Sequence, residues 1–321
     1  MKKLLLAFLA LTSFVFGDHD HNDRGSKAEL RIGAQPYPLY APIWAAKELG
    51  YLDEEFKKVG ATYTWNVFGN GPLVNEGVRG GSIDLGMMAD LPAIIAKSVG
   101  LDIVVFANFG IGEKALALIV PIDSPIKEVK DIKGKKIAYG KGTYAQHLLA
   151  LLVNNAGLKN GDFEHVNLGA GDIPNAIRTG QVDGAVIWEQ YISLLVVPGE
   201  ARVVADGTGI KLGNNISYIK KDFADKHPEV LTAYVKAIER GAKYINGDNK
   251  AAAKLLSPTF KVTPEVLEKV FSHFEYYAKF QPRDIKEIET VKNYVLKEKI
   301  IRKDVDIKEF VTTKYIEKAG I

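Results

Sequence analysis

The chain has 321 residues, more than a single hydrophobic core usually supports, so we expect two domains. Apolar residues make up 47% of the sequence and charged residues 25%, the proportions of an ordinary globular protein rather than a disordered or fibrous one. The formal net charge of +3 gives no argument for nucleic-acid or membrane binding, and the absence of cysteine excludes disulfides, thiolate metal sites and cysteine nucleophiles.

The first 17 residues have the pattern of a cleavable secretory signal. Lys2 and Lys3 precede an apolar run over 4–16, and Gly17 follows it. The run is too short for a membrane span, and no cysteine follows that could carry a lipid anchor. We therefore expect an exported, periplasmic protein that has lost residues 1–17.

Residues 18–27 are polar and lack periodicity, which predicts a disordered arm. His19 and His21 lie among aspartates and could chelate a divalent metal. We favour a solvated linker, because nothing packs nearby to hold a coordination geometry.

The first domain begins at residue 28. We expect strands over 30–34, 61–68, 83–88 and 103–108, with helices over 42–49 and 73–79 and a further helix after Asp90. Asp90 is a suitable N-cap, and Pro92 suits the first turn of that helix. A segment over 115–119 is expected to cross into the second domain.

The second domain repeats the plan of the first. Residues 74–90 align with 173–189, so that Arg79, Gly81 and Asp84 fall on Arg178, Gly180 and Asp183. At the end of the alignment, 89–90 falls on 188–189. The basic run 133–136 should be a solvated face, followed by a strand over 136–139 and a helix over 147–155. Further strands are expected over 166–168, 185–187 and 202–205.

Residues 214–220 are expected to cross back to the first domain. From residue 222 the chain should be helical, over 227–246, 250–256, 263–274, 284–297 and 308–321. The predicted fold is therefore α/β, with two similar doubly wound domains joined by two crossing strands and a helical C-terminal tail. The predicted domains are 28–114 with 221–321, and 115–220.

Ligands of open α/β sheets bind at the carboxyl ends of the strands, and two like domains suggest a cleft between them. The turn 140–143 leads from a strand into a helix, whose first N–H groups favour an anion. The repeat and the second crossing nominate twelve candidate ligand-binding residues: Gln35, Tyr37, Asn70, Ala89, Asp90, Lys141, Gly142, Thr143, Tyr144, Trp188, Glu189 and Asn214.

Several of these residues have two readings. Trp188 is either an aromatic wall of the cleft or ordinary core, and Asp90 is either an N-cap or a ligand contact. Glu189 could pair with Lys141 or Arg178, or receive a ligand cation. No His-Asp-Ser grouping, Walker lysine or metal-ligand spacing occurs in the sequence, so we expect a binding protein without a cofactor rather than an enzyme.

With these residues in view, the chain resembles periplasmic solute-binding proteins of ABC importers, in the group that binds aliphatic sulfonates, taurine and nitrate. The segments that carry the resemblance are 33–36, 46–51, 81–84, 124–125, 133–136, 141–143 and 182–188.

The resemblance implies a monomer whose two lobes close over one small oxyanion. The helix N-termini after Asp90 and Thr143 would hold this ligand. It also implies an ABC permease as the partner. Two alternatives remain open. Tyr37, Tyr144 and Trp188 would also suit an aromatic vitamin precursor, such as a pyrimidine or a flavin-like solute. The second alternative is an enzyme resembling the pyrimidine synthases. The secretion signal and the lack of cysteine argue against this alternative.

Overall fold

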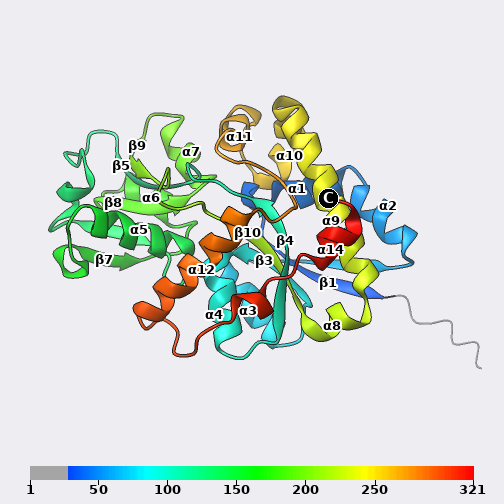
Figure 1. The fold of residues 1–321 in the computed structure, drawn as a ribbon. Coiled ribbons are helices and arrows are strands. Elements are labelled where there is room, and N and C mark those ends of the chain that lie inside the picture. The colour runs from blue at the N-terminus through cyan, green and yellow to red at the C-terminus, as the bar shows by residue number, and fades with distance from the viewer. Residues whose placement is uncertain (1–27) are drawn as a thin grey trace, which may run out of the picture.

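The computed structural model describes residues 28–321, which form two lobes, each built around a five-stranded sheet (Figure 1). The predicted signal (1–17) and the predicted arm (18–27) with His19 and His21 lie outside the described residues. Within residues 28–321, no helix combines the length and the apolar character needed to cross a membrane. The predicted α/β class with two similar domains and a helical tail is confirmed.

The first lobe contains β1 (Glu29–Ala34), β2 (Thr62–Val67), β3 (Leu85–Ala89), β4 (Ile103–Gly110) and β10 (Asn215–Lys220), in the order β2-β1-β3-β10-β4. β1 runs parallel to β2 and β3, whereas β10 is antiparallel to β3 and β4. The helices of this half are α1 (Ala41–Glu48), α2 (Tyr51–Lys58), α3 (Gly71–Arg79) and α4 (Asp90–Ser98). β3 is buried along its whole length, as its apolar sequence predicts.

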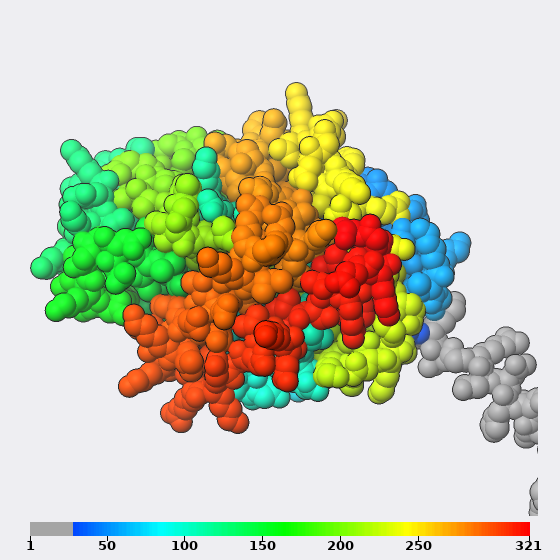
Figure 2. All heavy atoms as spheres, viewed as in Figure 1, coloured from blue at the N-terminus to red at the C-terminus, as the bar shows by residue number. Residues whose placement is uncertain are grey.

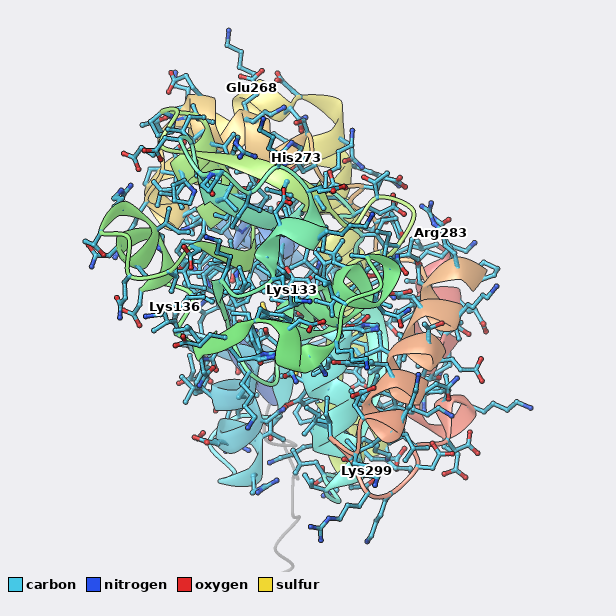
Figure 3. The ribbon with its side chains drawn as sticks, turned by 90° about the vertical axis from the view of Figure 1, so that its left-hand side faces the viewer. Lys133, Lys136, Glu268, His273, Arg283 and Lys299 are labelled. Atoms are coloured by element: carbon cyan, nitrogen blue, oxygen red, sulfur yellow. The ribbon has the colours of Figure 1, made fainter. Side chains whose placement is uncertain are left out.

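The second lobe contains β5 (Leu116–Pro121), β6 (Lys136–Tyr139), β7 (Glu164–Asn167), β8 (Gly184–Trp188) and β9 (Ala201–Asp206), in the order β7-β6-β8-β5-β9. Its helices are α5 (Tyr144–Asn155), α6 (Ile173–Arg178) and α7 (Tyr191–Val196). β6 is parallel to β7 and β8, and β5 is antiparallel to β8 and β9. Lys133 and Lys136 are exposed on this lobe, as predicted for the basic run (Figure 3).

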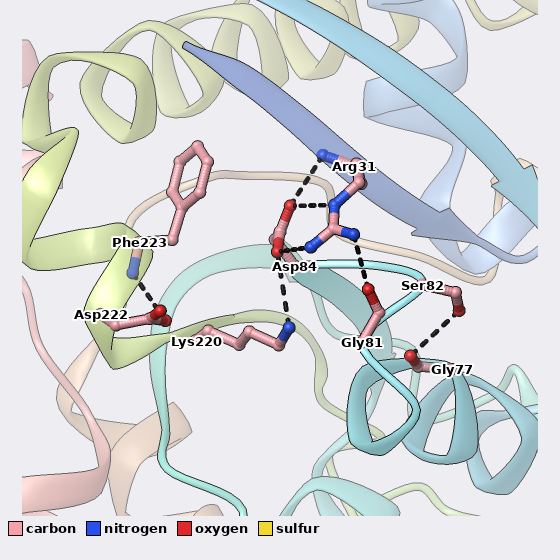
Figure 4. A network of polar contacts seen from close by, with 8 residues as sticks. All are labelled: Arg31, Gly77, Gly81, Ser82, Asp84, Lys220, Asp222 and Phe223. Atoms are coloured by element: carbon pink, nitrogen blue, oxygen red, sulfur yellow. Dashed lines mark hydrogen bonds and ion pairs between the residues drawn. The ribbon is translucent and has the colours of Figure 1, made fainter. Parts of the chain in front are cut away.

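The internal repeat of the sequence is a structural repeat. The Asp84 carboxylate accepts a hydrogen bond from the backbone N–H of Arg31, and the carboxylate of Asp183, its counterpart, accepts one from the backbone N–H of Lys136 at 2.7 Å. Each aspartate thus ties the residue just before a buried strand, β3 or β8, to the neighbouring parallel strand, β1 or β6. The Asp84 carboxylate makes two further contacts: it pairs with the Arg31 guanidinium and lies 3.5 Å from Lys220 Nζ (Figure 4).

The crossings between the lobes differ from the prediction. Residues 116–121 form β5 in the second sheet, and 215–220 form β10 between β3 and β4 in the first sheet. The chain therefore crosses in the short segments 111–115 and 207–214 that precede these strands. The two segments lie side by side, since Gly112 N–H donates to the Leu212 carbonyl at 2.9 Å. Gly213 has φ +67° and would place a Cβ 2.9 Å from the Gly112 oxygen, so this close approach requires glycine.

The C-terminal tail is helical, as predicted. It contains α8 (Lys221–Lys226), α9 (Pro228–Gly247), α10 (Asn249–Phe260), α11 (Pro264–Phe271), α12 (Pro282–Lys297), α13 (Ile307–Phe310) and α14 (Lys314–Ala319). α9 packs against α1, while α12 lies between α4 and the second lobe (Figures 1 and 2). Tyr294 of α12 stacks on His147 of α5 with ring centroids 4.2 Å apart. The tail therefore contacts both lobes.

Candidate functional site

A small cavity of about 20 Å³ lies where the two lobes meet. It has room for about one water molecule, so a larger ligand requires the lobes to stand further apart than they do in this structure. The first lobe contributes the end of β1, the 3-10 turn Pro38–Tyr40, and the ends of β3, α3 and α4 that face the second lobe. The second lobe contributes the start of α5 and the end of β8. The lining residues are Gln35, Tyr37, Leu39, Tyr40, Asn70, Gly71, Pro72, Ala89, Pro92, Thr143, Tyr144 and Trp188.

Seven of the twelve candidate residues border this cavity: Gln35, Tyr37, Asn70, Ala89, Thr143, Tyr144 and Trp188. They come from both lobes and from separate strand ends, because each lobe presents the carboxyl ends of its parallel strands to the other. The lining residues that sequence reasoning missed are Leu39, Tyr40, Gly71, Pro72 and Pro92. All five are within three residues of a predicted one, and the turn signals Pro38 and Pro72 could have pointed to them.

Two residues that line the cavity, Tyr144 and Trp188, carry buried hydrogen-bond donors without a partner. Tyr144 is 4% exposed and Trp188 6%, and neither the Tyr144 hydroxyl nor the Trp188 indole nitrogen is hydrogen-bonded within residues 28–321. Burial raises the pKa of Tyr144 well above its ordinary value, so the phenol keeps its proton. Trp188 packs on Tyr144 and on Tyr37 of the other lobe, with ring centroids 5.7 and 6.1 Å apart. Trp188 is thus both a wall of the cavity and a contact between lobes.

In the turn before α5, two backbone N–H groups are already hydrogen-bonded to side chains of the second lobe. Lys141 N–H donates to Asn167 Oδ1 and Gly142 N–H to Gln146 Oε1, both at 2.9 Å. Lys141 and Gly142 do not line the cavity. The Thr143 hydroxyl donates to the Gly140 carbonyl at 2.6 Å and does not cap the helix. The first N–H groups of α5 therefore begin beside the cavity without a side-chain cap.

Asp90 follows the lining residue Ala89 but does not itself line the cavity. It is 1% exposed, accepts from Leu91 N–H at 2.7 Å and lies 3.4 Å from the buried Lys211 Nζ. Lys211 also lies 3.1 Å from Glu287 of α12. Burial raises the pKa of Asp90 to about 6, although the Lys211 charge acts to lower it. The N-cap prediction for Asp90 is wrong: Asp90 is the first residue of α4, Ala89 is its N-cap, and no side chain caps the helix.

Glu189 is the counterpart of Asp90 in the repeat, and its carboxylate is likewise hydrogen-bonded to other residues of the chain. It is fully buried and accepts from Ser193 N–H at 3.0 Å and from Ser193 Oγ at 2.9 Å. The ring of His273, from the segment after α11, lies 2.7 Å from Glu189 Oε1. The suggested partners do not pair with it, since Arg178 bonds to Glu200 and Lys141 is exposed. Glu189 does not line the cavity.

Asn214 also lies away from the cavity. It is fully buried, and its amide donates to the Asp284 carbonyl at 2.8 Å at the start of α12. Its place at the end of the second crossing segment explains this contact. Asn214 therefore anchors the tail beside the crossing.

Known proteins with similar sequences and structures are ligand-binding proteins in the main. The chain is 28% identical to a putative aliphatic sulfonates-binding protein of Bacillus subtilis, over 99% of this chain and 97% of the relative. It is 30% identical to the taurine-binding periplasmic protein of Escherichia coli, over 59% of each chain. Among solved structures, the alkanesulfonate-binding protein SsuA from Xanthomonas axonopodis pv. citri, bound to MOPS, superimposes with a TM-score of 0.82 at 26% identity, covering 90% of this chain and 99% of that one.

Enzymes also occur among the similar proteins. The 4-amino-5-hydroxymethyl-2-methylpyrimidine phosphate synthase of Schizosaccharomyces pombe is 27% identical over 77% of this chain and 75% of its own length. Binding proteins and this synthase thus share one sequence pattern. Residues 38–252 match the family described as NMT1/THI5 like, which is more than half of the sequence, and the chain belongs to that family.

Proposed function

We propose that this chain is the periplasmic substrate-binding component of an ABC importer, and that it binds a small organic anion of the aliphatic sulfonate type between its lobes. The names of its relatives support this class of protein and of ligand. The observation that carries the proposal is the pair of buried, unpartnered donors on Tyr144 and Trp188, which line the cavity. A buried donor without a partner is unfavourable, and an anionic oxygen in the cavity would accept from both.

The N-terminus of α5 is the helix end best suited to the anion. Thr143 and Tyr144 both line the cavity, and the positive end of the helix dipole favours negative charge there. The start of α4 is less suitable, because Leu91 N–H is already bonded to Asp90 and Pro92 has no N–H. We therefore place the oxyanion beside Tyr144 and Trp188 rather than beside Asp90.

The aromatic lining favours a second candidate, an uncharged aromatic solute such as a pyrimidine vitamin precursor. Tyr37, Tyr40, Tyr144 and Trp188 all border the cavity, and their faces and edges could enclose a ring. The synthase among the relatives acts in pyrimidine chemistry by its name. A protein that bound pyrimidines and no sulfonate would favour this candidate over the first.

A binding screen of the ligand-stripped protein separates these candidates. The panel should contain alkanesulfonates, taurine, nitrate, pyrimidines and flavins, with thermal unfolding and calorimetry as readouts. A ligand at 100 times its dissociation constant adds about 2.7 kcal/mol to the free energy of unfolding. We expect a sulfonate to give such a shift; no shift with any anion would contradict the proposal.

Trp188→Ala should weaken sulfonate binding about 100-fold, a loss of ~2.7 kcal/mol, because it removes one charge-assisted hydrogen bond and one wall of the cavity. Trp65→Ala is the matched control. Trp65 also has an unpartnered indole nitrogen, but it packs on Trp44 in the first lobe and does not line the cavity. Circular dichroism should show both variants folded. Unchanged affinity in Trp188→Ala would show that this tryptophan is only a core residue.

The proposal extends to compartment and partners. We expect cleavage after residue 17, a monomer in solution and docking of the closed lobes on an inner-membrane permease. Mass spectrometry of the exported protein tests the cleavage, and an intact mass that includes residues 1–17 would contradict it.

A further inference from the structure

A buried lysine joins the second crossing segment to α4 and α12. Lys211 is 2% exposed, and it is the only lysine or arginine among the buried residues of 28–321. Its Nζ lies 3.4 Å from Asp90 Oδ2 at the start of α4 and 3.1 Å from Glu287 Oε1 of α12. Burial acts to lower the pKa of Lys211, but the charges of Asp90 and Glu287 outweigh burial and raise it above its ordinary value. Lys211 therefore stays charged, and one ammonium serves two carboxylates.

The two carboxylates give this cluster an excess of negative charge next to the lining of the cavity. Asp90 directly follows the lining residue Ala89, and Tyr144 lines the cavity from the other lobe. Burial raises the pKa of Tyr144 well above its ordinary value, and interactions with Tyr40, Asp90 and Glu189 act in the same direction. The negative charge of Asp90 therefore reaches the hydroxyl that is proposed to bind the ligand, and it would repel an oxyanion there.

The other carboxylate that acts on Tyr144 has partners of its own. Glu189 accepts from Ser193 Oγ and lies 2.7 Å from the ring of His273, so its charge is not offset by Lys211. The charge of Lys211 reaches the second lobe as well, because together with burial it lowers the pKa of His147 in α5. α5 is the helix whose N-terminus borders the cavity. The field of Lys211 thus extends to the helix proposed to hold the oxyanion.

Asp90 has no other cation beside it within residues 28–321. The titratable groups that interact with its carboxylate are Lys211, Glu287, Tyr40 of the 3-10 turn and Tyr144 of α5. Both tyrosines stay neutral, because burial raises their pKa values. On α3 and β10, which also pack on α4, Glu76 and Arg79 are exposed and Lys220 pairs with Asp84.

We propose that Lys211 is the counter-charge of the oxyanion site and acts through Asp90. Held between Asp90 and Glu287, its ammonium offsets the negative charge beside Tyr144 and so allows an oxyanion to bind there. The inference rests on the proposed function and adds to it a residue that does not line the cavity. Without Lys211, the two buried carboxylates would repel the ligand.

A double variant separates this electrostatic role from a structural one. Lys211→Met removes the ammonium, and calorimetry at pH 7.5 should show propane-1-sulfonate bound roughly tenfold more weakly. In Lys211→Met/Glu287→Gln the cluster regains the net charge of the wild-type protein, and the affinity should return to within about threefold of the wild-type value. Equal losses in the two variants, both folded by circular dichroism, would show that Lys211 only supports the structure and would overturn the inference.

Lys220→Met is the matched control for the loss of a lysine. Lys220 Nζ also lies 3.5 Å from a buried aspartate, Asp84, but neither residue lines the cavity. The affinity of this variant for propane-1-sulfonate should equal that of the wild-type protein. A loss as large as that of Lys211→Met would mean that removing any such lysine weakens binding, and the inference would be wrong.

The pH profile of binding tests the same account without removing the lysine. The Asp90 carboxyl, with a pKa of about 6, loses its charge as the pH falls from 7.5 to 5, whereas a sulfonate stays ionised. The affinity of the wild-type protein for propane-1-sulfonate should therefore rise roughly tenfold over this range. Asp90→Asn, which can still accept from Leu91 N–H, should bind tightly at both pH values.

This profile decides the inference if Lys211→Met does not fold. A wild-type affinity that stays constant or falls toward pH 5, or the same profile in Asp90→Asn, would overturn the inference and leave the proposed function standing. Failure of the wild-type protein to bind any sulfonate would overturn the proposed function and the inference with it.

Discussion

His147 is a buried titratable side chain with no hydrogen-bond partner. It is 1% exposed, both ring nitrogens are unpaired within residues 28–321, and its ring stacks on Tyr294. Burial lowers the pKa of His147 to about 2, and the charge of Lys211 acts in the same direction. The folded protein therefore holds this histidine neutral at pH values where the unfolded chain would protonate it.

This difference predicts acid sensitivity. The folded-state pKa lies below the unfolded value of about 6.5, so the unfolded state binds the extra proton and stability falls as pH drops from ~6.5 toward ~2. By pH 4.5 the loss should reach about 2.7 kcal/mol. His147→Phe keeps the stacking on Tyr294 and removes the titration. Urea unfolding at pH 7.5 and 4.5 should show a smaller loss in the variant; an equal loss in both proteins would contradict this account.

At the scale of elements, the contact between α1 and α9 depends on one glycine. A Cβ at Gly241 of α9 would lie 1.8 Å from the backbone oxygen of Pro42 in α1, and a backbone atom cannot rotate aside. Gly247 ends the same helix with nothing within 4 Å of its Cβ position. The helices therefore approach closely at one position of α9 and leave another open.

We expect Gly241→Ala to destabilise the protein by about 3 kcal/mol, because the two helices must move apart. Gly247→Ala should be neutral or stabilising by up to ~1 kcal/mol, since alanine has the higher helix propensity. Chemical unfolding of both variants checks the difference. Similar stabilities for the two would show that α1 and α9 can adjust at no cost.

At the scale of the molecule, the described state has its lobes in contact across the cavity. Tyr37 of the first lobe packs on Trp188 and Tyr191 of the second, and Gln190 donates to the carbonyl of Phe260. These contacts separate if the lobes rotate about the crossing segments 111–115 and 207–214. A ligand that bridges the lobes would hold them together, because it binds the closed state better than the open one.

Small-angle X-ray scattering should therefore show a smaller radius of gyration with a bound sulfonate than without one. Trp188→Ala, which is expected to lose the ligand, is the control and should show no change on adding sulfonate. Identical radii for the wild-type protein with and without bound ligand would mean that binding does not close the lobes.

Much of this molecule can be predicted from its sequence. The repeat of 74–90 in 173–189 predicts two copies of one α/β plan, and the structure places Ala89 and Trp188 at the ends of corresponding strands, β3 and β8. Strand ends follow from local pattern, and the rule that ligands bind at the carboxyl ends of strands nominates neighbours of the cavity. That is why seven of the twelve candidates border it.

Tertiary structure alone decided the direction and the partners of the other side chains. Asp90 pairs with Lys211, 121 residues away, and Glu189 with His273, 84 residues away. No local pattern links such residues, because each contact depends on how the crossing segment or the tail lies across both lobes. The same holds for β10, whose sequence predicts a strand but not its sheet. The hydrophobic periodicity of a sequence predicts which residues of a helix or strand are buried. Pairing between buried groups that are distant in the sequence depends on how the whole chain packs.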